Sequence, residues 1–108
     1  MAIAALLEFP PQGGQSEAES REQYDDVSRE FTGGQLMRSC ADWGPGHQAH
    51  VAGQAQDGSW WVIDVWESQD AMDRFLGRMM PILRPRIDEA GMSEPAVRVI
   101  AVHNLVTD

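Results

Sequence analysis

The stretch that decides the fold is WWVIDVWES at residues 60–68, which carries three of the four tryptophans of the chain. Successive residues of a strand point to opposite faces of a sheet, and this strand is apolar on both faces. Both faces of its sheet must therefore be covered. In a chain of 108 residues, one layer of helices can cover one face, and we expect a second subunit to cover the other.

Hydrophobic periodicity and turn residues place four strands and two helices along the chain. The predicted strands are residues 1–9, 46–55, 59–67 and 96–105, and the predicted helices are residues 19–31 and 68–91. Ser68 is a suitable N-cap for the second helix, which Pro81 and Pro85 should kink or split into two pieces. This order predicts an α+β fold of the ferredoxin-like βαββαβ type, an antiparallel sheet with both helices on one face.

Two segments between these elements are predicted to be loop insertions within a single domain of residues 1–108. Residues 10–20 are rich in Gly, Gln, Ser and Glu, which indicates a mobile loop. Residues 32–45 form a linker that is long for so small a domain. A loop of this length is commonly a lid or disordered.

The charge balance excludes several classes of partner. The formal net charge is -9, and all 8 basic residues are arginines. No basic stripe is present to neutralise phosphates, so we expect neither nucleic acid nor an anionic membrane surface as a partner. The absence of lysine from the sequence also excludes Schiff-base chemistry through a lysine side chain.

Cysteine content and hydropathy indicate a cytoplasmic protein. Cys40 is the single cysteine, so no intrachain disulfide can form, and a reducing compartment is the simplest expectation. The apolar residues 1–8 are too few for a secretion signal. No apolar run approaches the roughly 20 residues of a membrane-spanning helix.

The hairpin turn at residues 56–58 (QDG) sets which side chains share a sheet face. If the loop has two residues, His50 lies opposite Val65 and Val51 lies opposite Asp64. His50 and Asp64 then point to opposite faces and form no dyad. A loop of three residues reverses this assignment.

Two side chains of this hairpin are candidate catalytic bases. An imidazole titrates near neutral pH and can take a proton from a phenol or an enolisable carbon, so His50 is our first choice, although it can equally be a structural histidine of a dimer interface. Asp64 is costly to bury without a partner, and burial is expected to raise its pKa. It is either a base, an orienter of a histidine, or the partner of an arginine, Arg98 or Arg38.

Three aromatic side chains are candidate substrate-binding residues. Trp60 and Trp66 share the sheet face of Asp64 and could stack on a planar molecule, or they could belong to the core. Tyr24 lies on the apolar face of the first helix. Its hydroxyl either reaches into a pocket or points to solvent from the edge of the core.

His103 and Asn104 lie near the end of the last predicted strand. The amide of Asn104 could hold an oxyanion, and His103 could act on the same substrate. For both residues the alternative is structural: His103 would cap the sheet edge, and Asn104 would make a turn or backbone contact.

We expect no metal and no organic cofactor. His47 and His50 are three residues apart on a strand and should point to opposite faces, so they should not share an ion. With one cysteine, a structural zinc site is not expected. The sequence contains neither a Gly-x-Gly-x-x-Gly nor a Walker pattern.

The sequence resembles the dimeric α/β-barrel superfamily, and within it the antibiotic biosynthesis monooxygenase (ABM) group. The resemblance lies in the order of elements, the size, and three segments: residues 50–53 (HVAG), residues 62–68 entering the second helix, and residues 102–105 (VHNL). It covers nearly the whole chain apart from the two insertions. It implies a homodimer whose sheets pack face to face into a barrel, with a pocket between sheet and helices in each subunit.

The resemblance also implies an enzyme that abstracts a proton from a small aromatic or polyketide-type molecule without a cofactor, as a monooxygenase or as a cyclase or isomerase. The base, the oxyanion donor and the aromatic wall would come from His50 or Asp64, from Asn104 or His103, and from Trp60 and Trp66. Haem degradation is not expected, because residues 68–91 contain no histidine. The alternative is a non-catalytic small-molecule-binding or accessory protein of the same fold. A cavity shared by His50 and Asp64 would favour the enzyme.

Overall fold

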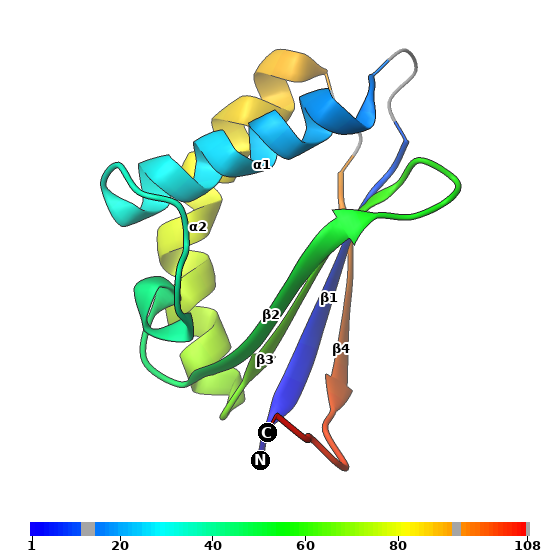
Figure 1. The fold of residues 1–108 in the computed structure, drawn as a ribbon. Helices are drawn as coiled ribbons and strands as arrows, with labels where there is room; N and C mark the ends of the chain where they lie inside the picture. The colour runs from blue at the N-terminus through cyan, green and yellow to red at the C-terminus, as the bar shows by residue number, and fades with distance from the viewer. Residues whose placement is uncertain (12–14, 92–93, 108) are drawn as a thin grey trace.

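The central feature of the structure is one antiparallel sheet whose four strands lie in the order β2-β3-β1-β4. The computed structural model describes residues 1–11, 15–91 and 94–107. The strands are β1 (Ile3–Phe9), β2 (His47–Gln54), β3 (Trp60–Trp66) and β4 (Ala96–Ala101). Helices α1 (Glu17–Thr32) and α2 (Gln69–Ala90) lie on the same side of this sheet (Figure 1). The predicted ferredoxin-like α+β fold is confirmed.

A capping box makes α1 begin at Glu17 rather than at residue 19. The Ser16 hydroxyl accepts a hydrogen bond from the Glu19 N–H, and the Glu19 carboxylate accepts one from the Ser16 N–H. The predicted loop at residues 10–20 is therefore too long, and its residues 12–14 lie outside the described part of the chain. At the other end of α1, Gly33 adopts a φ of 84° and terminates the helix.

Helix α2 runs without a break through Pro81 and Pro85 and bends along its length (Figure 1). Of the two expected outcomes, a kinked helix and a helix split into two pieces, the structure shows a bent, continuous helix. Ser68 caps its start by accepting a hydrogen bond from the Ala71 N–H at 3.1 Å. Gly91 closes its end with a φ of 65°.

The linker at residues 32–45 is mostly exposed but packs into the core through Trp43. It contains a short 3-10 helix, η1 (Cys40–Trp43), whose last side chain is only 4% exposed. The Trp43 ring stacks on Phe75 of α2 with a centroid distance of 5.0 Å. The expectation of a lid or a disordered loop is therefore wrong for this part of the linker, because Trp43 is a core residue.

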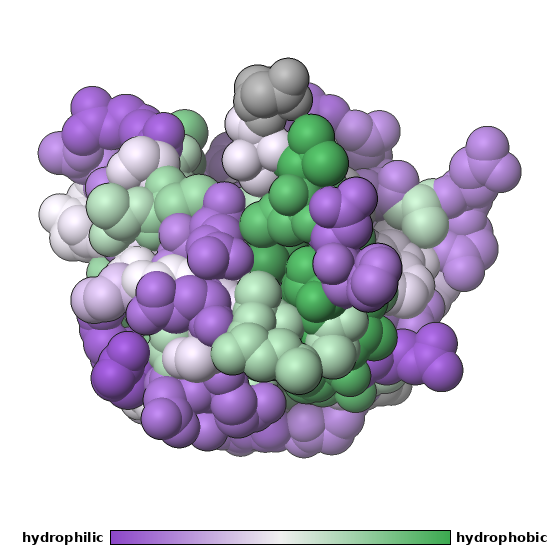
Figure 2. Space-filling model, turned by 90° about the horizontal axis from the view of Figure 1, so that it is seen from below, coloured by the Kyte–Doolittle hydropathy of each residue, from purple (hydrophilic) through white to green (hydrophobic). Residues whose placement is uncertain are grey.

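One face of the sheet is covered by the helices, and the opposite face is largely exposed. The helix side holds a core of buried side chains that includes Ile3, Phe31, Trp43, Trp66, Met72, Phe75 and Met79. On the opposite side, Val51 and Ile100 are 61% and 53% exposed. Seen from below, hydrophobic residues gather in one band that hydrophilic residues border (Figure 2). Among the described residues, no helix combines the length and the apolar character needed to cross a bilayer.

Candidate functional site

The hairpin between β2 and β3 has a three-residue loop, and this corrects the predicted register. The Asp57 carboxylate accepts hydrogen bonds from the Ser59 N–H at 2.9 Å and from the Ser59 hydroxyl at 2.6 Å. The Gly58 N–H donates to the Ala55 carbonyl at 3.0 Å, with a φ of 91° at Gly58. These bonds keep residues 56–58 together in the turn. The strands consequently pair one residue away from the two-residue prediction.

The corrected register brings the two candidate bases together. His50 pairs with Asp64, and Val51 pairs with Ile63. Directly paired residues share a face, so His50 and Asp64 both point to the helix side of the sheet. The expectation that they lie on opposite faces and form no dyad is wrong.

An irregularity at the start of β2 adds His47 to the same face. The register shifts between His47 and Ala49, so that His47 pairs with Trp66 while Ala49 pairs with Val65. A bulge of this kind lets one extra residue, here the exposed Gln48, leave the alternation of the strand. The prediction that His47 and His50 point to opposite faces is therefore also wrong.

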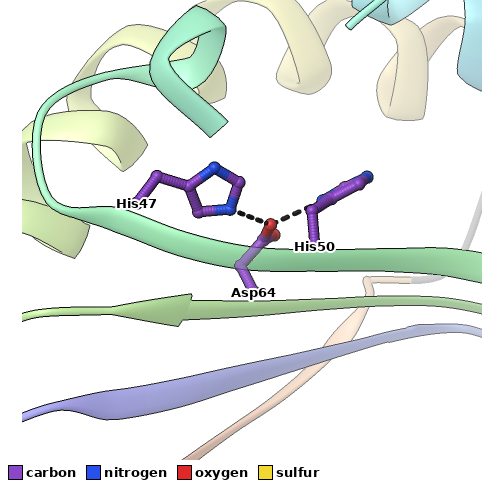
Figure 3. Close-up of side chains that lie close together, drawn as sticks. All are labelled: His47, His50 and Asp64. Carbon is purple, nitrogen blue, oxygen red and sulfur yellow. Dashed lines mark hydrogen bonds and ion pairs between the residues drawn. The ribbon is translucent and has the colours of Figure 1, made fainter. Parts of the chain in front are cut away.

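The two histidines converge on one carboxylate oxygen of Asp64 (Figure 3). His47 Nε2 lies 2.7 Å from Asp64 Oδ1, and His50 Nδ1 lies 2.6 Å from the same atom. The other nitrogen of His50 contacts the Tyr24 hydroxyl at 2.5 Å. The other nitrogen of His47 lies 3.2 Å from the Cys40 carbonyl oxygen. A chain of hydrogen bonds thus runs from α1 through the edge strand β2 and its neighbour β3 to η1.

Asp64 is 6% exposed, and its surroundings favour the ionised carboxylate. Burial by itself would raise the pKa of Asp64, but the hydrogen bonds from His47 and His50 outweigh burial and lower its pKa below the usual value. The expectation of a raised pKa is wrong for this reason. The side-chain partners of Asp64 are His47 and His50. The alternative of a pair with Arg98 or Arg38 is therefore wrong.

Tyr24 is held as a neutral phenol. Burial, followed by the negative charges of Asp64 and Asp25, raises the pKa of Tyr24 to about 12. Its ring stacks on the imidazole of His50 with a centroid distance of 5.9 Å. The hydroxyl therefore points into the cluster, which was one of the two alternatives for this residue.

A cavity of about 470 Å³ lies between the sheet and the helices. Tyr24 and Asp64 line it, and His50 is hydrogen-bonded to both of them. Trp60 and Trp66 also line it. The rest of its wall is mostly apolar, and α2 contributes a large part of it with Met72, Phe75, Leu76, Met79 and Leu83. The cavity can hold an apolar, flat molecule with one edge beside the Tyr24 hydroxyl.

His103 and Asn104 lie away from this cluster. Strand β4 ends at Ala101 rather than at residue 105, and both residues are exposed beyond its end. Neither contributes to the cavity wall among the described residues. The structure therefore does not bring them beside His50 and Asp64.

Two residues of the site were missed from the sequence. His47 was set aside because strand alternation, without the bulge, turns it away from His50. Trp43 was assigned to a loop, yet its ring lies 4.5 Å from the His50 ring and 5.9 Å from the His47 ring, centroid to centroid. An apolar tryptophan just before a strand is a sequence signal for core packing that could have identified it.

His47, His50 and Asp64 are also the one group of potential metal ligands among the described residues, with ligand atoms within 4.8 Å of one another. Two ligands at about 2.0–2.1 Å from one tetrahedral zinc lie roughly 3.3 Å from each other. The ring nitrogens of His47 and His50 instead lie 2.7 and 2.6 Å from Asp64 Oδ1, which are hydrogen-bond distances. Figure 3 instead shows the two imidazoles on either side of the carboxylate, each directed at its oxygen. This geometry suits hydrogen bonds better than a shared ion. The expectation that no cofactor is needed stays a prediction.

A ferredoxin-like sheet with a cavity under two helices defines a class of small α+β proteins. No family model matches the sequence, and no curated protein matches it. Among solved structures, Rv0793 from Mycobacterium tuberculosis is 17% identical, with 99% of this chain and 100% of that chain covered and a TM-score of 0.68.

Two further solved structures identify the fold more closely. A variant of SnoaB, a cofactor-independent oxygenase from Streptomyces nogalater, is 18% identical over 99% of this chain and 98% of that chain, with a TM-score of 0.64. A candidate antibiotic biosynthesis monooxygenase from Chloroflexus aurantiacus is 12% identical over 99% and 98%, with a TM-score of 0.60. The chain therefore has the fold of the ABM-like proteins, as its sequence indicated.

Proposed function

We propose that this protein is an enzyme that abstracts a proton from a small aromatic or polyketide-type molecule without a cofactor. The observation that carries the proposal is the hydrogen-bonded chain from Tyr24 through His50 to Asp64 at the wall of an apolar cavity. A buried polar chain of this kind beside an otherwise apolar cavity is an arrangement typical of catalytic sites. The likeness to SnoaB, itself a cofactor-independent oxygenase, supports the same class of reaction.

The base in this proposal is His50, reached through Tyr24. His50 donates its Nδ1 proton to Asp64, which leaves Nε2 with a lone pair directed at the Tyr24 hydroxyl. When the substrate gives a proton to the Tyr24 oxygen, the proton of Tyr24 moves to His50 Nε2. The electron pair stays on the substrate as an enolate or phenolate. Asp64 stabilises the imidazolium that forms.

The fate of the enolate decides the reaction class. In a monooxygenase, the carbanion carbon adds dioxygen, and loss of water turns a CH₂ group into a carbonyl, which balances the atoms of one O₂. In a cyclase or isomerase, the same enolate attacks a carbonyl or is reprotonated elsewhere. The apolar wall with Trp60 and Trp66 limits competing protonation by water in either case.

The alternative function is a non-catalytic protein that binds a small molecule in the same cavity. This alternative would have been favoured if His50 and Asp64 were buried in two separate places, away from a shared cavity. The shared cluster supports the enzyme, because a binding pocket needs no base with an acidic partner.

A substrate screen tests the proposal. The wild-type protein is incubated with hydroxylated polycyclic ketones that contain an acidic CH₂ group, and oxygen uptake and absorbance are followed in air and under argon. Turnover in air alone indicates an oxygenase, and turnover in both indicates a cyclase or isomerase.

We expect His50→Ala to lower turnover by roughly 10²-fold or more. His103→Gln, at an exposed histidine outside the cluster, is the matched control. Tight binding of these compounds without any turnover would support the binding protein.

A further inference from the structure

His47 is the part of the cluster that the proposed reaction does not use. Its side chain is fully buried, with 0% exposed, and it contacts Asp64 from the side opposite His50 (Figure 3). Its surroundings fix the number of protons it carries.

Each ring nitrogen of His47 faces an oxygen that can only accept a hydrogen bond. Nδ1 lies 3.2 Å from the backbone carbonyl oxygen of Cys40, which has no proton to give. A proton is therefore required on Nδ1. Nε2 lies 2.7 Å from Asp64 Oδ1, and an ionised carboxylate is also an acceptor only. The lowered pKa of Asp64 agrees with the ionised form.

The alternative placements of the protons are less favourable. If Nε2 of His47 lacked its proton, Asp64 would have to be protonated on Oδ1, the same atom that receives His50 Nδ1 at 2.6 Å. One oxygen would then donate to His47 while it accepts from His50, and the carboxylate charge that orients His50 would be lost. A protonated Nε2 on His47 satisfies all four contacts at once.

The ring of His47 also lies in a setting that suits a cation. Trp43 lies nearly parallel to it, at 14° with a centroid distance of 5.9 Å. Trp66 lies 4.5 Å from it at 32°. Aromatic faces at this range attract cations, most strongly when water is excluded. Of the titratable groups, Asp64 of β3 is hydrogen-bonded to the His47 ring and His50 of β2 lies edge-on to it, while η1 contributes the Trp43 ring and the Cys40 carbonyl.

We propose that His47 is a buried imidazolium that forms an ion pair with Asp64 and thereby positions His50 as the neutral Nδ1–H tautomer. The charge state stands on geometry alone, and its catalytic consequence rests on the proposed function. His47 is a positioning residue, because it touches Asp64 and not the cavity. When His50 accepts a proton, two cations flank one carboxylate, with ring centroids 5.9 Å apart. Their repulsion favours return of the proton to the product.

Nitrogen-15 NMR of the histidine-labelled full chain at pH 7 measures the charge state directly. The expected result is one histidine with protons on both ring nitrogens and a second, His50, with a proton on Nδ1 alone. Loss of each signal in His50→Gln and His103→Gln assigns the third histidine to His47 by elimination, so no variant of His47 has to fold. A single ring proton on His47 would overturn the proposal.

Two further measurements complete the test. Zinc is added at an equimolar concentration and then removed with a chelator. Unchanged signals support the ion pair, whereas reversible shifts of both His47 and His50 would show a metal site and overturn it.

His47→Gln keeps a donor toward Asp64 but removes the charge. If the enzyme turns over a substrate, the acidic limb of the pH–rate profile should move to higher pH in this variant. If the acidic limb stays at the same pH in His47→Gln, the proposed effect of His47 on catalysis is refuted. The charge state of His47 is then decided by the NMR result alone.

Discussion

His50 and Asp64 face each other across the β2–β3 ladder, and His50 Nδ1 lies 2.6 Å from Asp64 Oδ1. The pair is placed by the backbone register and not by a flexible loop. Asp64 is 6% exposed, and its carboxylate is hydrogen-bonded to His47 and His50. We therefore expect the same carboxylate to contribute both to the stability of the fold and to the orientation of His50, the proposed base.

Asp64→Asn should destabilise the protein. The neutral amide removes the carboxylate from a buried network with His47 and His50, and loss of one partner of a buried ion pair costs about 3 kcal/mol. Urea unfolding followed by tryptophan fluorescence measures the free energy of unfolding. Asp73→Asn is the control, because Asp73 lies on the exposed side of α2 and accepts one hydrogen bond from Gln69. Equal stability of the two variants would contradict a buried ion pair at Asp64.

The stability that Asp64 contributes should disappear in acid. Its pKa in the folded state is lowered by His47 and His50, so the unfolded chain binds this proton first as the pH falls. The contribution is complete above about pH 4, the unfolded value, and is lost as the pH drops through the folded value. Asp42 and Asp57 also have lowered pKa values, so the wild type must be compared with Asp64→Asn. The difference in unfolding free energy between the wild type and Asp64→Asn should become smaller below pH 4. A difference that does not change with pH would contradict an ionised Asp64.

Tyr24→Phe should separate catalysis from folding. The change removes the hydroxyl that contacts His50 and keeps the ring that packs on Trp60 at a centroid distance of 5.9 Å. We expect turnover to fall by roughly 10²-fold and stability to fall by only about 1 kcal/mol. Steady-state kinetics and urea unfolding give the two values. Full activity in Tyr24→Phe with loss in His50→Ala would mean that the substrate meets His50 directly.

The elements of the fold could be predicted from the sequence because each has a local cause. The run at residues 60–66 is apolar and ends at Ser68, which caps α2, and Gly33 terminates α1. Period-two alternation correctly placed Trp60, Asp64 and Trp66 on one face. Hydrophobic pattern and caps act within a few residues, so they can be read along the chain.

The pairing of the strands could not be predicted in the same way. Asp57 binds Ser59 through its side chain and lengthens the turn by one residue, which moves His50 to the other face of the sheet. The shift at His47 has no comparable sequence signal. The candidate residues His50, Asp64 and Tyr24 were identified from their chemistry. Their contact with one another depends on register, and so does the inclusion of His47.

Gly46 should be needed for the position of His47. It adopts a φ of 86°, and a Cβ there would come within 2.8 Å of the Ala71 Cβ and 2.9 Å of the Glu67 Cγ. Gly46→Ala should therefore cost about 1–3 kcal/mol and disturb the NMR signals of His47. Gly53→Ala, within β2 and with open space around it, is the control and should be nearly neutral. Thermal or urea unfolding compares the two, and a neutral Gly46→Ala would refute the steric constraint.

The exposed face of the sheet should be the interface of a homodimer. The side chains of Val51, Ile63, Leu6 and Ile100 lie on the face opposite the helices. Val51 is 61% exposed, so burial against a second copy would remove much apolar area from water.

Sedimentation should therefore find a dimer of the wild-type protein at micromolar concentration. Val51→Glu places a charge on this face, on the edge strand β2. It should shift the equilibrium toward monomer by at least tenfold, since burial of an unpaired carboxylate costs more than about 1.4 kcal/mol. Leu36→Glu, at an exposed leucine between α1 and η1, is the control and should remain dimeric. A folded wild-type monomer at these concentrations would refute the dimer. Equal dissociation of both variants would place the interface elsewhere.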